Sequence, residues 1–426
     1  MYDRMTITEE IFMTDTLFPS ATLPQSKDRA RADDLVARAR DLRPRLRKLQ
    51  TEHEALGGYS EEIHSELLEH GFYHALMPSR YGGLELEIDD FFRIGIEISR
   101  GDPGVGWSYI LGAGHSFHVA SFFSEAGQDE LFGSGPFIAP GRTVPSGKAV
   151  AADGGYRLSG RWDYCSGSMW STHALVVAPA TDAHGVMTGM RMFALPRTDY
   201  TILDDWGGDR TIGMRASSSH SIEATDVFVP EHLSVHYEFR EHELGTDGTI
   251  GYQLHGNPMY LGRTMLYFNA ELIATQIGAA WAAVDEYEEL MQAKASSFPP
   301  RIPRSEAPEY HRWFGKMLAL TDGAEAMFLG GVRQYAELGR LWAHTGRDFT
   351  PEEDGRLRAV VQQAAQLAND AVELAFTTAG STAAKRGSAL EKYYRDVAMY
   401  KTHIAAQWDV TYGALARYHL GAPLTF

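Results

Sequence analysis

The stretch Gly160-Arg-Trp-Asp-Tyr-Cys-Ser-Gly-Ser168 has the flanks of a β-strand but an unusual centre. It follows the turn Asp153-Gly-Gly-Tyr156 and leads toward the apolar run Val176-Val-Ala178, so both sides predict strand. Its centre, Cys165-Ser-Gly-Ser168, is small and polar, which is poor material for burying a sheet face. This combination indicates a strand that faces something other than a hydrophobic core.

Side chains alternate along a strand, so Trp162, Tyr164 and Ser166 are expected on one face and Asp163 and Cys165 on the other. Cys165 is the only cysteine of the chain, so no intramolecular disulfide can form. A lone buried cysteine is most often a small core residue. We therefore expect its thiol to point away from the face that carries Ser166.

The sequence around this stretch predicts three parts. At 426 residues the chain is long for one domain. Apolar residues recur at helical spacing before the stretch, short apolar runs split by turns surround it, and long helical patterns follow it. The predicted order is an N-terminal tail at 1–25, an N-terminal helical domain at 26–131, an antiparallel β-barrel domain at 132–245 and a C-terminal four-helix bundle at 246–426.

Composition and charge narrow the classes of partner. The net charge is −17, which disfavours nucleic acid and anionic membranes, because both bind clustered Lys and Arg. No apolar run approaches the roughly 20 residues that span a membrane, and the acidic start lacks a secretory signal. We expect a cytoplasmic protein with a small-molecule substrate and with no nucleic-acid or membrane partner.

Four short strings carry a resemblance to a known family. They are Pro78-Ser-Arg-Tyr-Gly-Gly83, Gly155-Tyr-Arg-Leu-Ser-Gly-Arg-Trp162, Gly213-Met-Arg-Ala-Ser-Ser-Ser-His220 and Tyr394-Arg-Asp396. Appearing in this order, they make the chain resemble the acyl-CoA dehydrogenase superfamily. The resemblance implies a flavin held between the β domain and the four-helix bundle, and a homotetramer.

The catalytic carboxylate of the dehydrogenases is missing at both places where the family carries it. Dehydrogenases need such a base to remove an acidic proton next to the thioester. Most have a Glu eight residues after the Asp of Arg-Asp, a position that is Ile404 here, beside His403. A minority have it in the first helix of the bundle, where this chain has Phe268, with Glu271 one turn away.

A chain with His403 in this place is similar to the two-component flavin-dependent monooxygenases, such as the oxygenase components of 4-hydroxyphenylacetate hydroxylase, steroid-phenol hydroxylase and dibenzothiophene monooxygenase. The resemblance implies reduced FMN or FAD supplied by a separate flavin reductase, with O2 as co-substrate. A C4a-hydroperoxyflavin would then hydroxylate an aromatic or polycyclic phenol, or N-oxygenate an amine. The alternatives are an acyl-CoA dehydrogenase with bound FAD and Glu271 as base, and a non-catalytic scaffold of the same fold.

The resemblance also implies roles for single residues. Ser166 falls where the dehydrogenases carry a Thr bonded to flavin N5, and Tyr164 where they carry an aromatic residue stacked on the ring. His403 is expected to take a proton from the substrate and to return it, because imidazole titrates near neutral pH. His115 is the third expected catalytic residue. The ordinary alternatives are a serine that ends an edge strand and histidines that belong to the core.

Trp107, His118 and Asp409 are expected to line the substrate pocket. His115 and His118 are three residues apart and share a helix face, as two metal ligands would. No third ligand follows by spacing, so we expect no metal. The sequence leaves open which of these two histidines lines the pocket.

Three residues near the C-terminal half are candidates for the flavin phosphate. Arg301 and Arg304 lie in a basic segment between two predicted helices and could reach a phosphate of a neighbouring subunit's flavin. Gly380 would let the backbone approach such a flavin closely. The alternative for the arginines is a solvated surface loop.

Overall fold

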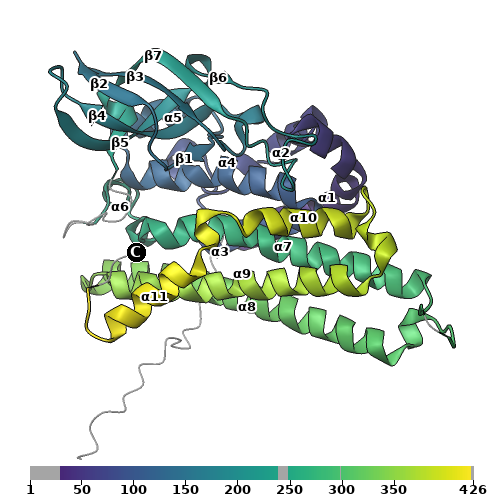
Figure 1. Ribbon diagram of the computed structural model, residues 1–426. Coiled ribbons are helices and arrows are strands. Elements are labelled where there is room, and N and C mark those ends of the chain that lie inside the picture. The colour runs from purple at the N-terminus through teal and green to yellow at the C-terminus, as the bar shows by residue number, and fades with distance from the viewer. Residues whose placement is uncertain (1–28, 238–247, 298, 424–426) are drawn as a thin grey trace, which may run out of the picture.

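The computed structural model describes residues 29–237, 248–297 and 299–423. It has a layered architecture, with a sheet and the N-terminal helices on one side and long helices on the other (Figure 1). The predicted order of helices, sheet and helices is confirmed. The predicted N-terminal tail at 1–25 lies outside the described residues. In the described part, no helix is long and apolar enough to cross a membrane.

The N-terminal helices are α1 (Arg29–Leu56), α2 (Glu61–Glu69), α3 (Ile88–Gly101), α4 (Pro103–Phe122) and α5 (Glu125–Gly133). Helix α4 is the innermost of them, because nearly all of its residues are buried. It begins where the Asp102 carboxylate accepts the N–H of Gly104, with Pro103 in the first turn. This helix packs against both α3 and α7 (Thr264–Ala293).

The central sheet contains strands β1 (Gly141–Arg142), β2 (Lys148–Ala152), β3 (Gly155–Trp162), β4 (His173–Thr181), β5 (Met187–Pro196), β6 (Thr201–Ile202), β7 (Ile222–Pro230) and β8 (Ser234–His236). Their order is β6-β7-β3-β2-β4-β5-β8, with β1 beside β4. Most pairs are antiparallel, but β1 and β2 run parallel to β4. The predicted antiparallel barrel is not confirmed, because no pairing among the described strands closes β6 onto β8.

The predicted alternation of side chains through Ser166 is wrong, because β3 ends at Trp162. Tyr164 has a left-handed backbone with φ of 62°, which interrupts the period of two. The segment 165–168 instead donates backbone hydrogen bonds to the carbonyls of residues 217, 218 and 220. Cys165 is fully buried, its thiol donates to the Trp162 carbonyl, and burial raises its pKa to about 12. Such a thiol is a core group and no nucleophile.

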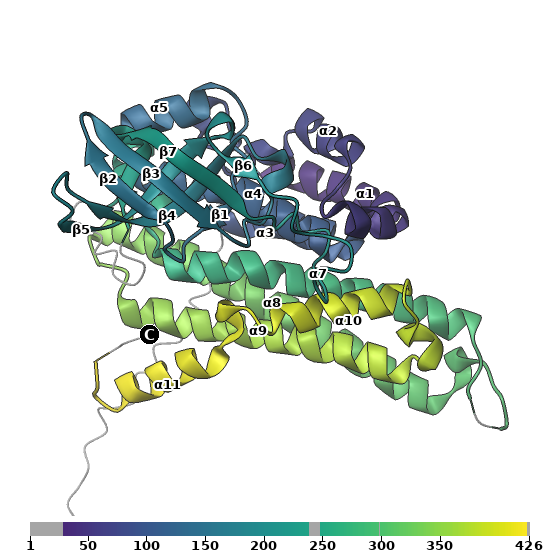
Figure 2. The same ribbon diagram turned by 45° about the horizontal axis from the view of Figure 1, so that its top comes forward.

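The C-terminal helices are α6 (Ile250–His255), α7, α8 (Pro308–Thr345), α9 (Pro351–Thr378), α10 (Ala389–Tyr400) and α11 (Trp408–His419). Helices α7, α8, α9 and α10 lie side by side (Figure 2). The helical pattern of the sequence over Leu390–Leu420 predicts one continuous helix, and this prediction is wrong, because the helix is broken between α10 and α11. At the break His403 is extended, and its imidazole accepts the N–H of Ala405 in competition with helical hydrogen bonding.

A buried ionic group joins the start of α4 to α10. Lys392 donates to Asp102 over 2.8 Å and to Asp396 over 2.7 Å. Asp396 also accepts the N–H of Met214 over 2.6 Å, which holds the loop before β7. The two carboxylates raise the pKa of Lys392 and keep it charged. This group therefore fixes α4, α10 and the 213–220 loop relative to one another.

Candidate active site

Three of the predicted site residues meet where the sheet faces α4 and the break after α10. The Trp107 indole of α4 donates to the Ser166 hydroxyl over 2.9 Å. The His403 ring lies edge-on to the Trp107 ring, with centroids 6.0 Å apart. Trp107 and Ser166 are buried and His403 is half-buried. The structure thus brings together a hydroxyl, an indole and an imidazole from three distant parts of the chain.

The Ser166 hydroxyl continues into a chain of serine hydroxyls. Its Oγ lies 2.7 Å from that of Ser219, which in turn lies 2.6 Å from that of Ser217. All three side chains are buried. Ser217 and Ser219 are not predicted as partners of Ser166 from the sequence, although both stand in the Gly213–His220 string that carries the family resemblance. They lie beside Ser166 through the backbone pairing of 165–168 with 217–220, which strand periodicity cannot predict.

Tyr164 presents an open aromatic ring at the rim of this cluster. Its side chain is 55% exposed, which is unusual for so large a ring. The edge of Trp206 supports it at 5.7 Å, and the Arg142 guanidinium lies 5.9 Å from its centroid. An exposed ring held in place beside a cation suits the face of a flat, conjugated ligand.

The backbone fixes the tautomer of His403. Its Nδ1 accepts the N–H of Ala405 over 3.1 Å, so the hydrogen of the neutral ring must be on Nε2. Burial, and to a lesser degree the charge of Arg142, lower the pKa of His403 to about 4. At neutral pH this ring is therefore uncharged and offers a donor at Nε2.

The backbone fixes the other tautomer for the His115 ring. Its Nδ1 lies 2.8 Å from the carbonyl of Ala139, which can only accept, so the hydrogen is on Nδ1 and Nε2 keeps its lone pair. Burial lowers its pKa to about 4. Gly141 is required here, because a side chain at this position would collide with the imidazole. His115 therefore offers an acceptor at neutral pH.

Glu271 lies behind His115 in the interface between α4 and α7. One carboxyl oxygen is 3.9 Å from His115 Nε2, and the side chain is fully buried. Neither oxygen accepts a hydrogen bond from a described residue, since the nearby Tyr267 hydroxyl donates to Gly114 instead. Burial raises the pKa of Glu271 well above its usual range, which favours the neutral carboxyl. An enclosed carboxyl whose burial favours the neutral form is poorly suited to be the base of a dehydrogenase.

His118 lies one turn beyond His115 and is packed among aromatic rings. Its centroid is 4.9 Å from that of Phe122 and 5.4 Å from that of Phe268. Phe268 also contacts His115 at 6.3 Å and so connects the two histidines. Within 29–237, 248–297 and 299–423, no group of three His, Cys, Asp or Glu residues could hold a metal ion.

The other predicted site residues lie apart from this cluster. Asp409 is exposed in the first turn of α11, and no hydrogen bond or ion pair of the described residues joins it to His403. Arg304 is buried beside Gly380, donates to the Ala379 carbonyl over 2.9 Å and stacks on a tyrosine ring. Arg301 is exposed in the same loop. This loop adjoins the N-terminal end of α10, whereas His403 follows its C-terminal end (Figure 1).

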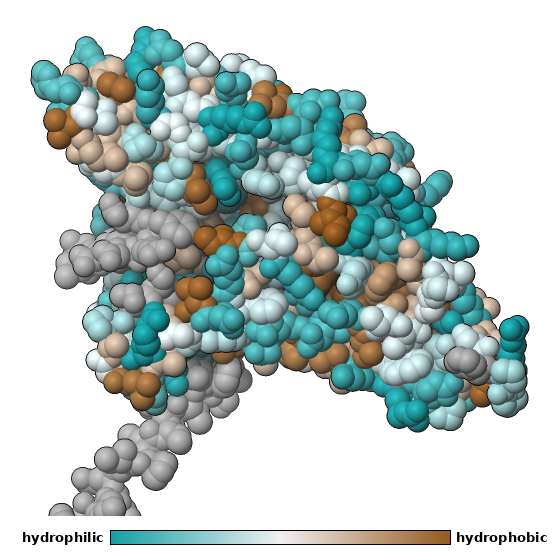
Figure 3. Space-filling view, in the orientation of Figure 1, coloured by the Kyte–Doolittle hydropathy of each residue, from teal (hydrophilic) through white to brown (hydrophobic). Residues whose placement is uncertain are grey.

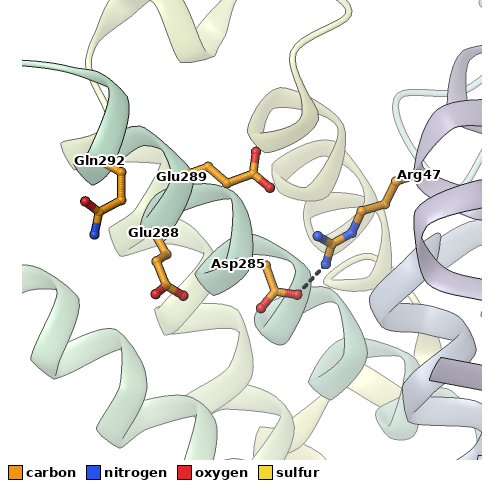
Figure 4. A pocket seen from close by; sticks show the side chains of 5 residues that line it. All are labelled: Arg47, Asp285, Glu288, Glu289 and Gln292. Atoms are coloured by element: carbon orange, nitrogen blue, oxygen red, sulfur yellow. Dashed lines mark hydrogen bonds and ion pairs between the residues drawn. The ribbon is translucent and has the colours of Figure 1, made fainter. Parts of the chain in front are cut away.

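A polar hollow lies between α1 and α7 (Figure 4). It is lined by Arg47, Asp285, Glu288, Glu289 and Gln292. Arg47 and Arg100 both form ion pairs with Asp285. These three charges therefore hold α1 and α3 against α7. The face of the molecule in Figure 3 is largely hydrophilic with scattered apolar residues. Neither feature competes with the Ser166 cluster as a site for chemistry.

Two family models match the chain. The acyl-CoA dehydrogenase N-terminal domain matches residues 30–131, and the acyl-CoA dehydrogenase C-terminal domain matches residues 272–408. The two matches lie on either side of the sheet. Together they cover the N-terminal helices up to α5 and the C-terminal helices from α7 to the start of α11.

Named relatives and solved structures extend the similarity over almost the whole chain. A pigment production hydroxylase of a Rhodococcus species is 28% identical, over 86% of this chain and 90% of the relative. The flavin-dependent monooxygenase oxygenase subunit HsaA of Mycobacterium tuberculosis is 25% identical, over 92% and 96%. The structure of XiaF from a Streptomyces species, in complex with FADH2 and glycerol, superposes with a TM-score of 0.84 at 23% identity, covering 94% of this chain and 98% of XiaF.

Proposed function

Because the chain belongs to the acyl-CoA dehydrogenase family, we propose that it is the oxygenase component of a two-component flavin-dependent monooxygenase. The observation that carries this proposal is the make-up of the cluster. A hydroxyl, Ser166, accepts from the Trp107 indole, and the Trp107 ring contacts an imidazole that donates, His403, while a second imidazole that accepts, His115, lies further along α4. The carboxyl beside His115, Glu271, is enclosed, and its burial raises its pKa and favours the neutral form. The names of the relatives point the same way.

The residues present fit a reduced flavin, FMN or FAD, delivered by a separate reductase. Tyr164 would stack on the isoalloxazine, and the Ser166 hydroxyl would bond its edge at N5. When bound, the reduced flavin reacts with O2 and supplies an electrophilic oxygen atom. The enclosing side chains of Trp107 and Ser166 would keep water from that reaction.

The two histidines would act on the substrate in opposite ways, and the acceptor role expected of His403 would fall to His115, because His403 carries its hydrogen on Nε2. His115 Nε2 would accept the hydrogen of a phenol hydroxyl or of an amine, which makes the substrate more electron-rich. His403 Nε2 would donate to the oxygen being transferred. Trp107 and His118 would line the pocket, and Asp409 would enter it only after a rearrangement of α11. An electrophilic oxygen selects an aromatic or polycyclic phenol first and an amine second.

The flavin phosphate would be bound by Arg301 of a neighbouring subunit in a homotetramer. Arg301 is exposed and its guanidinium makes no hydrogen bond or ion pair with a described residue. Arg304 would act indirectly, because its contacts hold the backbone next to Gly380. The backbone of Gly380 has a φ of 92°, a conformation that favours glycine. Because glycine has no side chain, a flavin could approach this backbone closely.

Anaerobic titration of the purified protein with reduced FMN and reduced FAD tests this proposal. We expect saturable binding of at least one reduced flavin that is tighter than binding of the oxidised form. Tight binding of oxidised FAD, with reduction by an acyl-CoA in the absence of a reductase, would favour a dehydrogenase. Failure to bind flavin in either redox state would favour a scaffold without catalysis.

A further inference from the structure

The hydrogen-bonded chain from Trp107 to Ser217 begins with one link whose direction is fixed by its donor. The Trp107 indole can only donate, so Ser166 must accept from it with one lone pair. Each serine hydroxyl carries one hydrogen and two lone pairs. The contacts Ser166 to Ser219 and Ser219 to Ser217 are short enough to be hydrogen bonds in either direction.

We propose that Ser219 is a positioning residue that takes the hydrogen of Ser166 and thereby makes Ser166 an acceptor toward the flavin. With its hydrogen directed at Ser219 and one lone pair used by Trp107, Ser166 has a single remaining capacity, which is to accept. Reduced isoalloxazine carries an N–H at N5, whereas the oxidised ring has a bare nitrogen that only accepts. The serine chain therefore selects the reduced cofactor over the oxidised one.

This inference rests on the proposed function, because it concerns the flavin that the site would hold. It adds a prediction that the proposal alone does not make. If Ser219 is removed, the hydrogen of Ser166 has no acceptor in the chain and turns toward the ligand. Two donors, the Ser166 hydroxyl and the flavin N–H, would then face each other in a buried site, which is unfavourable.

The test compares the dissociation constants of reduced and oxidised FMN and FAD for wild type and for Ser219→Ala. Binding of the reduced flavin should weaken about 3- to 10-fold, the value of one neutral hydrogen bond. Binding of the oxidised flavin should be unchanged or tighter, because the freed hydrogen can bond its N5. Ser219→Thr keeps a hydroxyl and should restore the preference for the reduced form.

Ser218→Ala is the matched control in the same loop. The Ser218 hydroxyl accepts the N–H of Met169 and does not belong to the chain of hydroxyls. This variant should retain the wild-type ratio of the two dissociation constants. Thermal unfolding of each variant checks that the loop still folds.

A double-mutant cycle decides whether Ser219 acts through Ser166. In a Ser166→Ala background, Ser219→Ala should have no further effect on the affinity for reduced flavin. Additive losses, or equal weakening of both redox states by Ser219→Ala, would overturn the inference. If wild type bound no reduced flavin at all, the proposed function would fail instead, so the two failures are distinguishable.

Discussion

His115 and His403 are the same kind of residue in two contrasting regions. His115 lies in the middle of α4, a helix that is buried on almost every side, and His403 lies in a break between two helices near the surface. The first gives its Nδ1 hydrogen to a carbonyl, and the second receives a hydrogen from a backbone N–H. The pKa values of both rings are lowered to about 4, yet one ring accepts and the other donates at Nε2. The backbone partner, rather than burial, decides the chemistry of each ring.

The largest effect on stability is expected from a substitution that breaks the connection between these two regions. Lys392 joins the start of the helix that carries His115 to the helix that precedes His403. Lys392→Met leaves two buried carboxylates without their cation, which should cost about 3 to 5 kcal/mol of unfolding free energy. Chemical denaturation measures this loss. Lys401→Met is the control, because its exposed pair with Glu373 should contribute less than about 1 kcal/mol.

Removal of the accepting ring should have the largest effect on turnover. His115→Phe deletes the acceptor, so hydroxylation of a responsive substrate from a panel of substituted phenols should fall about 100-fold or more. The affinity for reduced flavin should stay near that of wild type. Single-turnover product yield and flavin titration measure the two effects separately. Equal loss of both would mean that His115 supports the fold rather than the substrate.

Removal of the donating ring should have a smaller effect and should be rescued by another donor. His403→Phe is expected to lower product yield about 10-fold and to raise the release of hydrogen peroxide, because one donor to the transferred oxygen is lost. His403→Gln keeps a donor and should recover most of the yield. If the Gln and Phe variants were equally impaired, the donor role of Nε2 would be wrong.

The smallest effect near neutral pH is expected from the titration of His115, which changes the free energy of unfolding. Burial lowers the pKa of His115 from about 6.5 to about 4, so the folded chain binds fewer protons than the unfolded chain between these values. The free energy of unfolding therefore has its full value above about pH 6.5. It decreases as the pH falls to about 4, by up to about 1.4 kcal/mol per pH unit. His115→Asn should flatten this dependence in unfolding measurements. An unchanged slope would show that His115 is not a buried neutral ring.

The sequence predicts most helices well, because helical periodicity over α1, α3 and α7 reports directly on burial. It does not predict the break after α10, since no proline or glycine stands between Tyr400 and Trp408. The cause is a side-chain hydrogen bond of His403 to the backbone, which has no pattern in the sequence. The different burial of Tyr164 and Ser166, which strand alternation predicts on one face, is missed for a similar reason, because Tyr164 adopts a left-handed conformation that is uncommon outside glycine.

The site residues also divide into those that the sequence predicts and those that it does not. Ser166, Trp107 and His403 come from three separate segments, and the family resemblance placed all of them in one site before their contacts were known. Ser219 could not be singled out among the adjacent serines 217, 218 and 219, because only the pairing of two irregular segments shows which hydroxyl reaches Ser166.

Transfer of oxygen from isotopically labelled O2 is the most direct measurement of the central claim. The protein would be supplied with reduced flavin by a flavin reductase, together with a responsive phenol and heavy O2, and the product would be analysed by mass spectrometry. We predict one heavy oxygen atom in each molecule of hydroxylated product. Recovery of all the label in hydrogen peroxide and water, with an unlabelled or unchanged phenol, would contradict the account.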